Sequence, residues 1–259
     1  MARHLAIVFL LVVLAVSVAP SRYAMADGSC AAIRVGGADL WYPYAFRDAD
    51  SNEARGIAYD LIRWIGNELQ VPVVFGERVP WARTEMLFDH GDLDVIAGVY
   101  NGSERWEGRG FLTIPFAEDK VSVFVKKGEE FPFSAPEDLN GRLGAALLGA
   151  RWGARFERHR SKLPLQEVQK HEQVLRMILR DRVDYGVLPY FTGKYWASQL
   201  TGGDRLTALD TPISINPVHF VIARGSPCAG LLRRINGLIT KARETGVLDG
   251  IVSMHTPVS

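Results

Sequence analysis

The hydrophobic pattern of the chain changes period repeatedly, and each change predicts an element of secondary structure. In the segment 56–70, apolar side chains recur at helical spacing, which places Ile57, Leu61 and Ile65 on one face. Short apolar runs bounded by Gly, Pro or Asp predict buried strands. The first part of the chain is thus predicted to hold strands at 31–37, 71–79 and 93–100 and helices at 56–70 and 81–91. Strands that alternate with helices predict an α/β fold with a mostly parallel sheet.

The second half repeats this pattern after a strand of a different kind. The segment 120–127 alternates and is charged at both ends, so we expect the chain to cross there between two lobes. The predicted elements that follow are a strand at 142–150, a helix at 172–182, a strand at 183–191, a returning strand at 216–225 and an amphipathic segment at 231–252. Two crossings predict one lobe from 27–122 with 218–259 and another from 123–217, with a ligand cleft between them.

The N-terminus has the layout of a secretory signal peptide. A short basic start with Arg3 precedes an apolar run from Leu5 to Val18, and a small-x-small sequence ends at Ala26. We therefore expect export to the periplasm, with cleavage after Ala26. Removing residues 1–26 takes Arg3 and Arg22 from the 30 basic residues, which leaves 28 against 29 acidic ones. This near-neutral balance argues against nucleic acid and anionic membrane surfaces as partners.

The two cysteines, Cys30 and Cys228, lie near opposite ends of the exported chain. Exported proteins can keep disulfides, and a bridge here would tie the first strand to the start of the last helical segment. A buried pair of reduced thiols fits the sequence equally well.

Signals of catalysis are sparse. The chain has no G-x-S-x-G, P-loop or G-x-G-x-x-G motif, and its six histidines form no group with metal-ligand spacing. We therefore expect neither an enzyme nor a bound cofactor or metal.

Candidate ligand contacts follow the predicted strands, because ligands of α/β sheets bind beyond the carboxyl ends of the strands. Arg105 follows the strand 93–100, and its guanidinium can hold a carboxylate with two hydrogen bonds. Aromatic side chains in the loop after the first strand suit stacking against a ligand. The predicted contacts are Trp41, Tyr44, Trp81, Gly98, Tyr100, Arg105, Gly149, Ala150, Arg151 and Tyr190.

Structural roles remain open for several of these residues. Arg105 is equally compatible with a surface ion pair to Glu104 or Glu107. The aromatic loop would also serve as an apolar plug, Trp81 as a structural residue, and Arg151 as a solvated charge at a helix start.

The motifs "DLWYPYAF", "PWARTEMLFDHGDLDVIAGVYNGSERWEGRGFLTIPF" and "LRDRVDYGVLP" occur in an order that resembles the polar amino-acid (family 3) extracellular solute-binding proteins, the receptors of ABC importers. The similarity extends over most of residues 31–255. It implies two α/β lobes whose two mixed, mostly parallel sheets are joined by two hinge strands, and which close on a ligand.

The resemblance also implies roles for particular residues. Trp41 takes the place of the family's stacking aromatic, and Arg105 takes that of the arginine that grips the ligand carboxylate. Gly98 and Tyr100 fall on the strand end whose backbone contacts the ligand.

Three positions depart from the family pattern. Gly102 replaces a threonine that helps to hold the carboxylate, and Gly149-Ala150 stands where Gly-Thr or Gly-Ser is common. Pro189 replaces the aspartate that receives the ligand ammonium, which leaves open whether the ligand carries an amine.

Together these features predict a periplasmic solute-binding protein, monomeric and without cofactor, that captures a small carboxylate-bearing or amino-acid-like ligand for an ABC permease. Two other functions remain open. One is a ligand-sensing partner of a membrane receptor, and the other, ranked third, is a periplasmic lyase of the cyclohexadienyl dehydratase kind.

Overall fold

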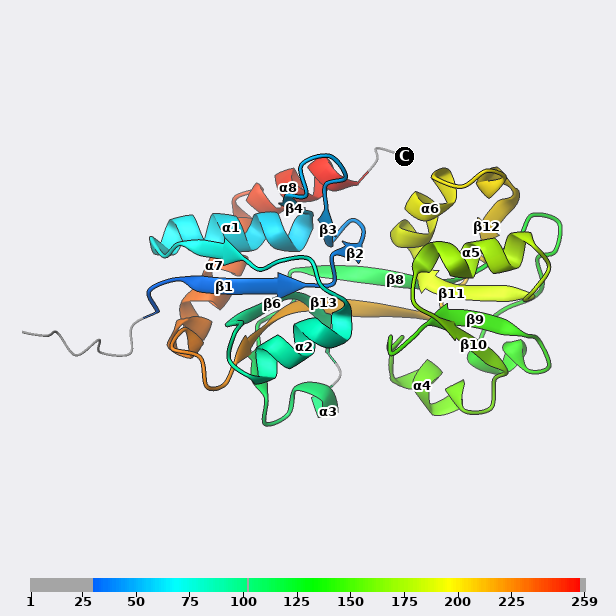
Figure 1. Ribbon diagram of the computed structural model, residues 1–259, viewed down its shortest axis with the longest axis horizontal. Coiled ribbons are helices and arrows are strands. Elements are labelled where there is room, and N and C mark those ends of the chain that lie inside the picture. The colour runs from blue at the N-terminus through cyan, green and yellow to red at the C-terminus, as the bar shows by residue number, and fades with distance from the viewer. Residues whose placement is uncertain (1–29, 102, 257–259) are drawn as a thin grey trace, which may run out of the picture.

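Two long strands that run through both halves of the molecule organise the fold. The computed structural model describes residues 30–101 and 103–256, so the predicted signal peptide lies outside the described residues. Two lobes lie side by side, and both β8 (Ala117–Lys126) and β13 (Ser214–Ala223) extend from one lobe into the other (Figure 1). These crossing strands pair antiparallel, with Ala117 opposite Val218 and Val121 opposite Ser214.

The first lobe is built from both ends of the chain. Its elements are β1 (Ile33–Gly37), β2 (Leu40–Trp41), β3 (Ala45–Arg47), β4 (Ala54–Arg55), α1 (Ile57–Leu69), β5 (Val73–Phe75), α2 (Trp81–Asp89), β6 (Val95–Tyr100), α3 (Ser103–Trp106), β7 (Gly110–Leu112), η3 (Ala229–Leu231), α7 (Leu232–Glu244) and α8 (Val247–His255). The amphipathic segment predicted at 231–252 is therefore two helices.

The second lobe is built from the middle of the chain. Its elements are η1 (Pro136–Leu139), β9 (Gly144–Leu147), α4 (Ala154–Arg160), β10 (Leu165–Val168), α5 (His171–Leu179), β11 (Tyr185–Pro189), α6 (Tyr190–Ser198), η2 (Gly203–Arg205) and β12 (Leu206–Ala208). In Figure 1, α4 lies on one side of the strands of this lobe, and α5 and α6 lie on the other.

A single hydrogen-bonded sheet passes through both lobes, in the order β10-β9-β11-β8-β13-β6-β1-β5. In this sheet the strands within each lobe pair in parallel, and the pairs made by the two crossing strands are antiparallel. The short strands β2, β3 and β4 of the first lobe form a separate antiparallel sheet. The two-lobed α/β fold is as predicted, with the two expected sheets continuous through the crossing strands. The predicted lobe boundaries at 122/123 and 217/218 fall inside these strands and stay a prediction.

The apolar periodicity of the first lobe fixes its core. Ile57, Leu61 and Ile65 of α1 are buried, as their helical spacing predicted. Gly66 lets the same helix approach β5, because an added Cβ would lie 2.3 Å from Val73 Cγ2. Residues from the end of the chain, such as Ile235, complete this cluster. The first lobe therefore has a core only when both ends of the chain are present.

The second lobe buries both faces of its strands. Along β8, Val123 packs into the cluster that contains Phe156 of α4, and the next residue, Phe124, packs into the cluster that contains Val174 of α5. This alternation follows from the period of two along a strand. None of the helices in the described ranges is long and apolar enough to cross a membrane.

Candidate functional site

Three aromatic side chains gather where β6 ends beside the crossing strand β13. The ring centroid of Trp41 lies 4.8 Å from that of Tyr44 and 5.1 Å from that of Tyr100. Trp41 and Tyr44 are buried. The sequence predicted all three as ligand contacts, and the structure brings them together near one carboxylate, that of Asp119.

Asp119, on β8, was not among the predicted site residues. Its Oδ2 accepts hydrogen bonds from Trp41 Nε1 at 2.9 Å and from the Tyr100 hydroxyl at 2.5 Å. Its Oδ1 is buried and has no hydrogen-bond partner within the described part of the chain. The side chain is 0% exposed, and this burial raises the pKa of the carboxyl to about 7, against the lowering effect of the two donors.

Trp41 also covers the end of β6. Gly98 has a φ of +90°, and a Cβ added there would lie 3.0 Å from Cζ3 of the Trp41 indole. The backbone conformation and the close contact both favour glycine. The strand end that the resemblance places against a ligand therefore lies against Trp41.

Arg105 is paired within the protein. Its Nε donates to Oε1 of Glu85 at 2.9 Å, and its Nη2 donates to Oε2 of the same carboxylate at 2.7 Å. The guanidinium also lies 5.4 Å from the centroid of the Trp81 ring. The sequence left open a pairing with Glu104 or Glu107, whereas the partner given by the structure is on α2. Glu85 takes two of the five N–H donors of this guanidinium, and the ligand contact of Arg105 stays a prediction.

A second arginine shares the same carboxylate. Arg109 Nη1 lies 3.3 Å from Glu85 Oε1, and the guanidinium makes two hydrogen bonds of 2.8 Å to Asp89. Two arginines and two carboxylates therefore compensate each other between α2 and the segment after β6. Gly102, where the family has a threonine, lies outside the described residues.

The predicted contacts of the second lobe occupy a turn after β9. Gly149 has a φ of +72° in this turn, and Ala150 follows it. The Arg151 side chain is 63% exposed and pairs with Glu157 at 3.3 Å. Arg151 is therefore a largely exposed charge beside α4, which agrees with the alternative interpretation, and its ligand contact stays a prediction.

Tyr190 lies closer to the crossing strands. It begins α6 directly after Pro189, and Nζ of Lys120 on β8 lies 5.1 Å from the centroid of its ring. This contact joins the second lobe to a crossing strand by a cation–π interaction.

The lobes also touch through α6 and the loop after β2. The Thr192 hydroxyl donates to the Tyr42 carbonyl oxygen at 2.6 Å. The rings of Tyr42 and Tyr195 stack with centroids 4.6 Å apart and planes 18° apart. These contacts fix the position of α6 against the first lobe.

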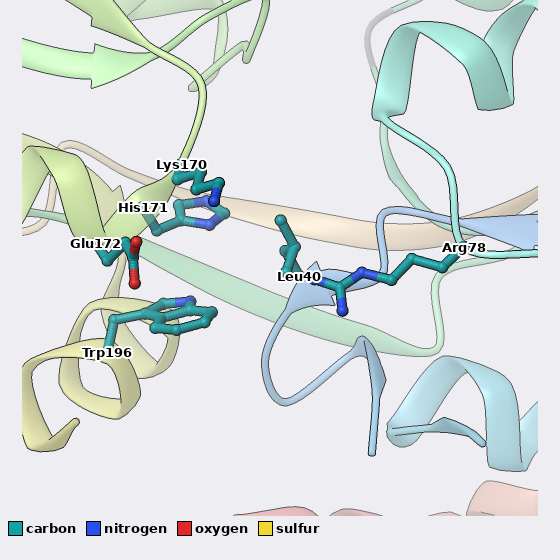
Figure 2. A pocket seen from close by; sticks show the side chains of 6 residues that line it. All are labelled: Leu40, Arg78, Lys170, His171, Glu172 and Trp196. Atoms are coloured by element: carbon teal, nitrogen blue, oxygen red, sulfur yellow. The ribbon is translucent and has the colours of Figure 1, made fainter. Parts of the chain in front are cut away.

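A cavity lies between the lobes beside these contacts. Its volume is about 90 Å³. A water molecule needs about 10–15 Å³ of cavity volume, so this cavity has room for a small polar group and several waters. It is lined by Leu40 and Arg78 of the first lobe and by Lys170, His171, Glu172 and Trp196 of the second (Figure 2).

Cys30 and Cys228 form a disulfide, with Cα atoms 4.6 Å apart and 198 residues apart in sequence. The bridge ties the chain before β1 to the residue before η3. Within residues 30–101 and 103–256, no three His, Cys, Asp or Glu side chains come together as a metal site.

Sequence reasoning missed both Asp119 and the cavity. Asp119 stands in the run "AEDKVSVFV", where charges at a strand end read as solvent exposure. Its buried place beside Trp41 and Tyr100 depends on the register that sets it opposite Asn216. The residues that line the cavity come from four separate segments, and only the fold brings them together.

The sequence of the chain matches one known protein family over most of its length. Residues 33–256 match the family described as bacterial extracellular solute-binding proteins, family 3. The comparison with curated proteins found no match.

Solved structures share the fold at low sequence identity. One is a histidine kinase sensor domain with similarity to periplasmic binding proteins, with 24% identity, a TM-score of 0.73, and coverage of 88% of this chain and 96% of that one. A second is the putative binding component of an ABC transporter from Wolinella succinogenes complexed with lysine, with 20% identity, a TM-score of 0.75, and coverage of 88% and 97%. A third is an ancestral amino acid-binding protein described as a precursor of cyclohexadienyl dehydratase, with 21% identity, a TM-score of 0.70, and coverage of 87% and 95%.

Proposed function

The chain belongs to the family 3 bacterial extracellular solute-binding proteins, and from this premise we propose that it captures a small carboxylate-bearing or amino-acid-like solute in the cleft between its lobes. One observation carries the proposal: side chains of both lobes line one cavity. A solute bound there touches both lobes at once, so binding favours the closed arrangement over an open one.

Among the functions that solute binding could serve, we rank uptake through an ABC permease first and sensing with a membrane receptor second. A receptor for uptake and a partner of a membrane sensor close on their ligands in the same way. The similar structures include both a transporter component and a sensor domain, and their identities support the shared fold alone. Export to the periplasm and a monomeric state belong to the same proposal.

We also propose that the protein is not an enzyme. A lyase of the dehydratase kind needs an acid or base that touches its substrate. Asp119 has a pKa raised to about 7, in the range useful for proton transfer, but it is 0% exposed and bonded to Trp41 and Tyr100. Its position supports a structural role between the lobes.

Thermal unfolding of the exported chain, Asp27 to Ser259, tests the proposed function. The panel comprises amino acids, dicarboxylates, aromatic acids and polyamines. A ligand at about one hundred times its Kd adds about 2.7 kcal/mol to the free energy of unfolding, which raises the Tm of a domain of this size by roughly 5–10 °C. A well-folded protein whose Tm no member of the panel raises would contradict the proposal.

Arg105→Ala, measured in parallel, decides whether Arg105 holds the ligand. Loss of about 2–5 kcal/mol of binding free energy would assign the ligand carboxylate to Arg105. Retained binding would assign the carboxylate to another group. Arg83→Ala is the matched control, because Arg83 is an exposed arginine of α2, the helix that carries Glu85.

A further inference from the structure

We propose that the carboxylate of the ligand is held in the cavity between the lobes, between the Arg78 guanidinium of the first lobe and the start of α5 in the second. This inference rests on the proposed function and names the part of the cleft where recognition takes place. None of the ligand contacts predicted from the sequence, Arg105 included, lines this cavity.

Within the described residues, the three charged side chains that line the cavity form no salt bridge. Arg78 and Lys170 make no salt bridge to any carboxylate in the described ranges, and Glu172 has no cationic partner there. The two cations reach the cavity from opposite lobes (Figure 2). Two cations against the one carboxylate of Glu172 leave a net positive lining, so an anionic group placed between the cations would be attracted to both lobes, and this attraction links binding to closure.

The start of α5 adds backbone donors on the same side. The helix has 9 residues and begins at His171, immediately after Lys170. The Gln173 side chain accepts from the N–H groups of Gln169 and Lys170, at 3.1 and 3.0 Å. The N–H groups of His171 and Glu172 have no acceptor among the residues that the structure describes. Unpaired N–H groups and the helix dipole favour an anion at this position.

Two ring nitrogens provide an independent sign of a ligand. His171 is 6% exposed, yet its Nδ1 has no hydrogen-bond partner within the described residues, and the same holds for Nε1 of Trp196. Both rings line the cavity and extend from the second lobe toward Leu40 (Figure 2). Buried polar atoms are rarely left without a partner, and a bound carboxylate would accept from the indole N–H once the ring turns its nitrogen, which is buried here, toward the cavity.

Burial keeps the His171 ring neutral, because it lowers the pKa of the imidazole to about 4. A neutral ring has one N–H and one free nitrogen, so it can either donate to a carboxylate or accept from another group of the ligand. His171 thus adds a hydrogen bond to the site without adding charge.

The family resemblance places the ligand carboxylate beside Arg105 and the end of β6. In the described part of this chain, that position has fewer unpaired cations and donors than the cavity has. Both fork donors of Arg105 that face Glu85 are engaged, and Trp41 covers Gly98. A carboxylate at that end would share the Arg105 guanidinium with Glu85, whereas one in the cavity would meet two cations and N–H groups without partners in the described residues, against repulsion from the single carboxylate of Glu172. The balance of desolvation and pairing therefore favours the cavity.

The indole N–H resonance of Trp196, assigned by its loss in Trp196→Phe, tests the proposal directly. The probes are succinate and L-glutamate, with succinamide as the neutral counterpart of succinate. We expect at least one of the two carboxylates to shift this resonance in a saturable manner, and succinamide to leave it in place. A carboxylate that raises the Tm without moving the Trp196 resonance would overturn the cavity assignment and leave the proposed function standing.

Four variants then measure the contribution of each cation. Arg78→Ala and Lys170→Ala should each weaken binding of the carboxylate about tenfold or more, as expected for loss of a charged hydrogen bond. Arg105→Ala should weaken binding less than Arg78→Ala does, and Arg83→Ala should bind as the wild type does. Both cavity cations are exposed, so their removal leaves the core intact. If Arg78→Ala and Lys170→Ala both bind the carboxylate with wild-type affinity, the assignment of the carboxylate to the cavity is overturned. If no solute of the panel binds the wild type, the proposed function itself is contradicted.

Discussion

Asp119→Asn should change how the stability of the protein depends on pH. The carboxyl of Asp119 is fully buried, and burial raises its pKa from 3.8 to about 7. The folded chain therefore holds this proton more tightly than the unfolded chain does. Between about pH 4 and pH 7 the unfolded state loses the proton first, so rising pH shifts the equilibrium toward unfolding. The stabilising contribution of the protonated carboxyl is complete below pH 4 and is lost above pH 7.

The size of the effect follows from the shift. The pKa rises by about three units, and each unit corresponds to about 1.4 kcal/mol, so the wild type loses about 4 kcal/mol of unfolding free energy across this window. Asparagine is nearly isosteric and does not ionise. Its carbonyl oxygen can still accept from Trp41 Nε1 and from the Tyr100 hydroxyl, the two donors to Oδ2 of Asp119. The variant therefore removes the titration and keeps the surroundings.

Urea unfolding of both proteins from pH 4 to pH 8 measures this effect. The quantity to compare is the unfolding free energy of the variant minus that of the wild type, because other titrating groups cancel in this difference. We expect the difference to rise by about 4 kcal/mol from pH 4 to pH 8. A difference that stays constant over the whole range would show that the carboxyl ionises as an exposed aspartate does, and would refute the reasoning from burial.

Two further predictions concern contacts far from Asp119. Denatured but unreduced protein should release no free thiol, and the double variant Cys30→Ser/Cys228→Ser should lose about 2–4 kcal/mol of unfolding free energy in urea; two thiols per chain would contradict the bridge. Tyr195→Ala should weaken binding of the solute found by thermal screening about 2- to 10-fold in calorimetry, because the stack on Tyr42 supports closure, and Tyr195→Phe should bind as the wild type does. Equal affinity in the alanine and phenylalanine variants would remove the stack from the closing mechanism.

Much of the fold could be predicted because its signals are local. The helix predicted at 56–70 is α1, and the strand predicted at 93–100 is β6, each within two residues. Such elements bury a continuous face that the sequence displays directly. The strand predicted at 71–79 is only Val73–Phe75, because it lies at the edge of the sheet and only this part pairs with β1. Turn residues and short apolar runs do not show how far a pairing extends.

The candidate site was less predictable because its geometry depends on distant partners. Arg105 follows a strand, as a ligand-binding arginine would, but its place opposite Glu85 arises from the packing of α2 beside β6. Asp119 reads as a strand-end charge until the register of the crossing strands is known. Trp41 was predicted to stack on a ligand, which stays a prediction, and its indole N–H reaches a carboxylate 78 residues away. Chemical type can be read from a sequence, but the partner of each group depends on the fold.

The order of strands has a consequence for how the chain is made. Synthesis proceeds from the N-terminus, and β13 is the last strand to emerge, yet it pairs with β6 on one side and β8 on the other. Until it arrives, one edge of β6 has no partner, and unpaired strand edges promote association between chains. The second lobe, in contrast, is a continuous segment whose helices and strands are complete well before the end. We therefore expect the second lobe to fold first, because all of its segments emerge before β13. The first lobe begins to emerge earlier, but it can complete its sheet only after β13 has been made.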